Sequence, residues 1–101
     1  MKSLEDYMKK IKNPELLSPE ERQIIASYYH TYSNLQKIYD KTLKFAIDHL
    51  ESDVDYGNNV NDALEQADQA KEVLEQAIED ININHNLKYH NDSEEKVGIP
   101  M

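Results

Sequence analysis

The sequence predicts an all-α protein built on a long antiparallel helical hairpin, with helices over about 19–55 and 60–83. Both segments carry apolar residues at steps of three and four, the spacing that places them on one face of a helix. A strong helix-start signal precedes the first segment, and an acidic run ending in glycine separates the two. With a short N-terminal helix packed on the hairpin, we expect a three-helix bundle or, if two hairpins associate, a dimeric four-helix-type bundle.

The N-terminal helix is predicted from Ser3 and the residues that follow it. Ser3 and Asp6 have the spacing of a capping box, with Asp replacing the usual Glu. Leu4, Tyr7, Met8 and Ile11 then share one helical face. This helix should end before Pro14, because a proline disfavours the helical conformation of the residue ahead of it.

The long middle helix is predicted to begin immediately after Ser18. Ser18 stands at the N-cap, Pro19 at the first helical position, and Glu21 at the position that closes a capping box. Heptad-like spacing follows, and further apolar residues widen the apolar arc enough to face two neighbours. The heptad-like row is Ile25, Tyr28, Tyr32, Leu35, Tyr39, Thr42, Ala46 and Leu50.

The last helix is predicted from the most regular heptad pattern in the chain, after a turn near 56–59 in which Gly57 ends the middle helix. Four alanines on its seam allow a neighbouring helix to approach closely. We therefore expect one helical domain over 1–84 and a flexible polar tail over 85–101. The seam of this helix consists of Val60, Ala63, Ala67, Ala70, Leu74, Ala77 and Ile81.

The composition of the chain limits the kinds of partner that it can bind. Acidic residues outnumber basic ones 20 to 11, for a net charge of −9, which disfavours direct nucleic-acid binding and would attract a partner with a basic surface. No membrane-spanning segment or signal peptide is recognisable, so we expect a cytoplasmic protein without a membrane partner. The abundance of Lys, Asn and Ile is typical of AT-rich coding sequence and favours a bacterial or phage source.

One candidate partner-binding surface is an acidic row on the last helix, pointing away from its apolar seam. Such a row is commonly only a solvated face that keeps a protein soluble. It also repeats carboxylates about every 5–6 Å, close to the phosphate step of a nucleic-acid strand, so it could occupy the basic groove of a nucleic-acid-binding protein. The row consists of Asp62, Glu65, Asp68, Glu72, Glu75 and Glu79.

A tyrosine cluster in the middle helix supplies a second candidate. We expect Tyr28, Tyr32 and Tyr39 to lie in the core, with their hydroxyls at its rim. Tyr29 is the tyrosine expected outside the core, where a large rigid ring can serve in recognition.

No catalytic, cofactor-binding or metal-binding residue is predicted. The chain has no cysteine, two glycines, and no motif for a phosphate loop, a dinucleotide or a serine nucleophile. None of the four histidines is paired at the spacing of a helical metal site, and His85 and His90 fall in the expected tail. We therefore expect a protein that is not an enzyme and needs no cofactor.

The leading hypothesis is a small acidic protein-binding module, an inhibitor or adaptor acting on a larger protein. The alternative is a self-associating structural protein, a homodimer or part of an assembly, motivated by the wide apolar arc and the alanine seam. A third hypothesis comes from architecture. A hairpin of this length with Tyr56-Gly57 near its midpoint resembles the WXG-type secreted helical hairpins, but lacks their Trp-x-Gly order.

Overall fold

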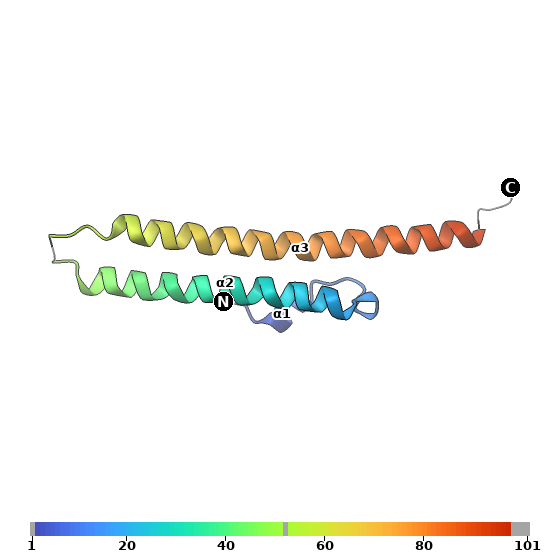
Figure 1. Ribbon diagram of the computed structural model, residues 1–101, viewed down its shortest axis with the longest axis horizontal. Helices are drawn as coiled ribbons and strands as arrows, with labels where there is room; N and C mark the ends of the chain where they lie inside the picture. The colour runs from blue at the N-terminus through green and yellow to red at the C-terminus, as the bar shows by residue number, and fades with distance from the viewer. Residues whose placement is uncertain (1, 52, 98–101) are drawn as a thin grey trace.

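The computed structural model describes residues 2–51 and 53–97, with side chains as far as residue 87. Its order is α1 (Leu4–Met8), the 3-10 turn η1 (Pro14–Leu16), α2 (Pro19–Asp48) and α3 (Gly57–Val97). The two long helices lie side by side and antiparallel, and α1 lies against one side of α2 (Figure 1). The described residues include no β-strand, so the predicted all-α hairpin is confirmed.

Both predicted capping boxes are formed. The Ser3 hydroxyl accepts from the Asp6 amide at 3.2 Å, and the Asp6 carboxylate accepts from the Ser3 amide at 3.1 Å. At the start of α2 the corresponding Ser18–Glu21 bonds are 3.1 and 2.9 Å long. Each box satisfies amides that a helix N-terminus leaves without an internal acceptor, which explains why both helices begin where expected.

The middle helix is shorter than predicted, because α2 ends at Asp48 rather than near 55. The amide of His49 closes the helix by donating to the carbonyls of Phe45 and Ala46. Glu51 lies just after the C-terminal end of α2, where the negative end of the helix dipole makes a carboxylate unfavourable.

The expected role of Gly57 as the end of the middle helix is also wrong, since Gly57 is the first residue of α3. Its amide donates to the Asp55 carboxylate at 2.8 Å, and an acidic group at a helix N-terminus is favourable. A Cβ at position 57 would lie 3.0 Å from that carboxylate oxygen, so glycine permits this close approach. The helix consequently begins three residues before the predicted start at Val60.

The last helix does not end near residue 83, but continues to Val97 and runs past the first turn of α2 (Figure 1). The expected boundary between a domain over 1–84 and a tail over 85–101 therefore falls inside α3, and residues 98–101 lie outside the described residues. His85 is the physical reason. It follows Ile81 by one turn on the same face and is only 4% exposed, so it continues the buried seam with a polar residue.

The core lies at the end of the hairpin where α1 packs, and its largest fully buried side chains are Tyr7, Ile25 and Leu74. Of the middle-helix row, Leu35 and Tyr39 are only partly buried because the hairpin beyond α1 is one layer of helices thick. The buried cluster comprises Tyr7, Ile11, Ile25, Tyr32, Leu74, Ile78 and Ile81.

Candidate functional site

The acidic row predicted on the last helix lies on the exposed face of α3. All six carboxylate residues are exposed, whereas Ala67 and Leu74 on the opposite side of the helix are fully buried. Because α3 is continuous through this region, the carboxylates are held on a rigid scaffold. The exposed residues are Asp62, Glu65, Asp68, Glu72, Glu75 and Glu79.

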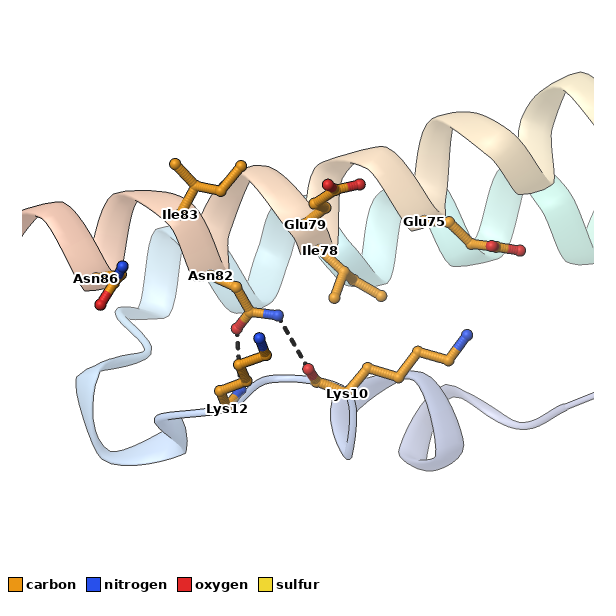
Figure 2. Close-up of a pocket in the computed structure, with 8 residues that line it drawn as sticks. All are labelled: Lys10, Lys12, Glu75, Ile78, Glu79, Asn82, Ile83 and Asn86. Atoms are coloured by element: carbon orange, nitrogen blue, oxygen red, sulfur yellow. Dashed lines mark hydrogen bonds between the residues drawn. The ribbon is translucent and has the colours of Figure 1, made fainter.

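The two ends of this row have different surroundings. Glu75 and Glu79 line a groove of about 490 Å³ together with Lys10 and Lys12 from the segment after α1 (Figure 2). The Lys10 ammonium also lies 5.0 Å from the centre of the Tyr7 ring. The two later carboxylates therefore share a groove with two lysines. The first four, which span roughly 15 Å of α3, lie outside this groove, and Lys71 is the lysine beside them on the same helix.

The groove is also lined by Asn82, whose side chain holds the N-terminal segment with two hydrogen bonds. Its amide nitrogen donates to the Lys10 carbonyl at 3.0 Å, and its oxygen accepts from the Lys12 amide at 2.9 Å (Figure 2). The Asn82 side chain thus satisfies one backbone donor, the Lys12 amide, and one backbone acceptor, the Lys10 carbonyl. The sequence contained no signal for this contact, because the partners are separated by about 70 residues.

Tyr32 is buried as predicted, but Tyr28 and Tyr29 are placed differently from the prediction. Tyr29, the expected recognition residue, is partly buried, and its ring lies 5.9 Å from that of Tyr7 at an interplanar angle of 57°. Tyr28, expected in the core, is 40% exposed. The reason is that α1 covers the Tyr29 side of α2 and leaves the Tyr28 side open. Tyr29 thus anchors α1, and the exposed aromatic surface is carried by its neighbour.

Tyr7 is the residue around which the packing of α1 is organised. Its ring is 1% exposed and meets the Tyr32 ring edge-on at 6.4 Å. Burial raises the pKa of Tyr7 to about 12, and the nearby Tyr32 and Glu75 add to the shift. The hydroxyl is therefore neutral at physiological pH and belongs to the folded core rather than to reactive chemistry.

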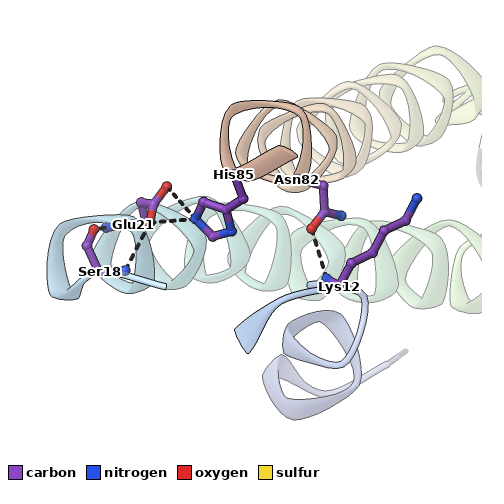
Figure 3. A network of polar contacts seen from close by, with 5 residues as sticks. All are labelled: Lys12, Ser18, Glu21, Asn82 and His85. Atoms are coloured by element: carbon purple, nitrogen blue, oxygen red, sulfur yellow. Dashed lines mark hydrogen bonds and ion pairs between the residues drawn. The ribbon is translucent and has the colours of Figure 1, made fainter. Parts of the chain in front are cut away.

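A second polar contact joins α3 to the start of α2. The His85 Nε2 lies 3.0 and 3.1 Å from the two Glu21 carboxylate oxygens, and Glu21 also accepts from the Ser18 amide (Figure 3). Burial of the Glu21 carboxylate raises its pKa, but the bonds from Ser18 and His85 outweigh burial and hold the pKa below its usual range. The His85 Nδ1 is buried with no hydrogen-bond partner among the residues described.

An aromatic cluster marks the other end of the hairpin. Phe45 and His49 stack at 3.9 Å between ring centres, and the Tyr56 ring meets Phe45 edge-on at 5.0 Å. These contacts join the end of α2 to the residue before α3. Leu50, in the same turn, is 76% exposed. The hairpin tip thus combines an internal aromatic contact with apolar side chains in solvent.

Within the described part of the chain, no three His, Asp or Glu side chains come together to hold a metal ion. The helices described there also lack any stretch long and apolar enough to cross a membrane. No protein-family model matches the chain, and neither a curated protein nor a solved structure matches it.

Proposed function

We propose that this protein is a non-catalytic binding module that uses the acidic face of α3 to occupy a basic surface on a larger protein. The supporting observation is the row of exposed carboxylates on one rigid helix, in a chain with a net charge of −9. Asp62, Glu65, Asp68 and Glu72 form the part of the row that lies outside the groove lined by Lys10 and Lys12.

The chemistry of the partner follows from this arrangement. Carboxylates on successive turns repeat about every 5–6 Å, so they match a row of Lys or Arg side chains such as those lining a nucleic-acid groove. Occupying that groove would make the protein an inhibitor, and holding it without blocking it would make it an adaptor. Long-range attraction between the opposite charges would accelerate binding and weaken at high salt.

The test begins with affinity capture of the partner from the source organism at low and high salt, followed by purification of the partner. Its affinity is then measured for the wild-type protein and for the triple variant Glu65→Lys, Asp68→Lys, Glu72→Lys. We expect the variant to lose binding by at least tenfold while retaining its circular dichroism spectrum, because all three residues are exposed.

A matched control distinguishes the effect of the acidic face on binding from the effect of the net charge. The triple variant Glu15→Lys, Asp40→Lys, Glu51→Lys changes the net charge equally, but at exposed positions outside α3. It should bind nearly as well as wild type. Equal losses in both variants would show that only net charge matters, and equal retention would exclude the acidic face as the binding surface.

A further inference from the structure

A second surface, on the other long helix, has the pattern of a helix–helix interface and is largely exposed, although its last residue, Phe45, also contacts His49 and Tyr56 at the hairpin tip. Seven residues of α2 alternate at steps of four and three, the heptad spacing of a coiled-coil seam. Ile24 is 45% exposed, Ile38 is 52% exposed and Phe45 is 47% exposed, although each is a large apolar side chain. We call this set the outer seam: Ile24, Tyr28, Thr31, Leu35, Ile38, Thr42 and Phe45.

The outer seam is distinct from the seam that holds the hairpin together. Ile25 and Tyr32 are buried, and the ring of Tyr29, on one side of them, packs against Tyr7 of α1. The outer seam runs along the other side, through Tyr28. On that side Tyr28 is 40% exposed and Ile38 is 52% exposed, so the described helices α1 and α3 leave it largely uncovered.

The order of side chains along the outer seam makes it complementary to itself. If a second copy runs antiparallel about a two-fold axis at Leu35, Tyr28 comes opposite Thr42, and Thr31 comes within one residue of the level of Ile38. A large side chain then faces a small one at both levels. Leu35 meets its own copy, and at the ends Ile24 comes within one residue of the level of Phe45. A two-fold interface requires such self-complementarity, because the same patch must serve both subunits.

The two threonines are compatible with an apolar interface. The Thr31 hydroxyl donates to the Ser27 carbonyl at 3.1 Å, and the Thr42 hydroxyl donates to the Ile38 carbonyl at 2.8 Å. Each hydroxyl is satisfied within its own helix. Covering these residues would therefore leave no hydroxyl donor without a partner, which is the usual cost of burying threonine.

Charge also favours a second copy at this helix rather than at the other. The α2 helix has four acidic and four basic residues, so its formal charge is zero. Between Asp62 and Asp80, α3 has seven acidic residues and one lysine. Two copies joined through α2 bring neutral helices together and keep the acidic faces apart, which limits repulsion between two chains of net charge −9.

We propose that the outer seam binds a second copy of this chain, forming an antiparallel two-fold dimer centred on Leu35. The dimer buries the outer seam over about 32 Å of α2 and turns two hairpins into a four-helix arrangement. The acidic face of α3 remains exposed on both copies. This inference concerns a different surface from the proposed function, and either can fail without the other.

The first test measures the molar mass of the full-length protein by sedimentation equilibrium over a wide concentration range. Wild type should approach twice the 11.8 kDa of one chain. Ile38→Glu should be monomeric at concentrations where wild type is dimeric, with an unchanged circular dichroism spectrum. Ile47→Glu is the matched control, because Ile47 is 56% exposed on the same helix but outside the outer seam. It should remain dimeric.

Two results would contradict the proposed dimer. A wild-type protein that is monomeric throughout would exclude the second copy and leave the outer seam to a different protein. A dimer that Ile38→Glu and Ile47→Glu weaken equally, or not at all, would place the interface elsewhere.

The orientation is tested by cross-linking, since the chain has no cysteine of its own. Ile24→Cys and Phe45→Cys are treated with a short bis-maleimide, separately and as an equimolar mixture. In the antiparallel dimer each cysteine is roughly 30 Å from its own copy, so only the mixture should give a cross-linked species, identified by mass as the heterodimer. Cross-linking of each variant alone would show a parallel dimer and overturn the proposed geometry.

Discussion

His85 Nε2 lies 3.0 Å from Glu21 Oε1 and thereby joins a late turn of α3 to the first turn of α2. A Glu21 carboxylate can only accept, so His85 donates through Nε2. The same carboxylate accepts from the Ser18 amide in the capping box. One acidic side chain therefore both starts α2 and holds α3 beside it.

Substituting His85→Ala should lower the free energy of unfolding by about 1–3 kcal/mol, because it removes a buried hydrogen bond to a carboxylate and leaves a cavity. Urea denaturation at neutral pH measures the loss. Asn84→Ala is the control, since Asn84 is the exposed neighbour, and its effect should stay within about 0.5 kcal/mol. Equal stability of His85→Ala and wild type would show that the His85–Glu21 contact contributes nothing.

Acid should destabilise the protein partly through Glu21. Its pKa is lowered in the folded state, so its contribution to stability is present above the unfolded-state pKa, near 4.3, and is lost as the pH falls through the lower folded-state value. The free energy of unfolding of Glu21→Gln should therefore fall less than that of wild type between about pH 5 and pH 3. Glu20→Gln, which removes an exposed carboxylate beside it, should retain the wild-type slope. Identical slopes in all three proteins would contradict this account.

Alkali should destabilise the protein through Tyr7. Its pKa is raised from 10.0 to about 12 in the folded state, so its contribution is complete below pH 10 and is lost as the pH rises through about 12. Tyr7→Phe should unfold less readily than wild type with rising pH in this interval. Absorbance titration at 295 nm should show that the last tyrosine to ionise is missing. Tyr28→Phe, at a 40% exposed position, should leave that last ionisation in place.

Asn82→Ala should release the segment that follows α1. Losing both side-chain bonds leaves the Lys10 carbonyl and the Lys12 amide without their partner, at an expected cost of about 1–3 kcal/mol. In Asn82→Ala, hydrogen exchange in residues 4–17 should become faster than in wild type, and the increase should be larger there than in α2. Asn86→Ala, an exposed asparagine lining the same groove, is the control and should exchange as wild type does. Unchanged protection in Asn82→Ala would mean that apolar packing alone holds the segment.

The starts of α1 and α2 and the buried face of α3 were predicted correctly from the sequence, whereas the start of α3 was not. The Ser3 and Ser18 capping boxes depend on residues within one turn, and both are formed. The heptad on α3 correctly identified Ala67 and Leu74 as buried, because one continuous helix places residues of this spacing on one face.

The end of α3 and the covered tyrosine depend on contacts between distant parts of the chain. Because His85 is polar, the hydropathy pattern predicted an end of the helix before this residue. The contact with Glu21, which is distant in the chain, makes the burial of His85 favourable. Tyr28 and Tyr29 are chemically identical and adjacent, and their burial differs because Tyr7 of α1 packs on one side of α2. Capping and periodicity are local in the chain and can be read from it, but these contacts join residues that only folding brings together.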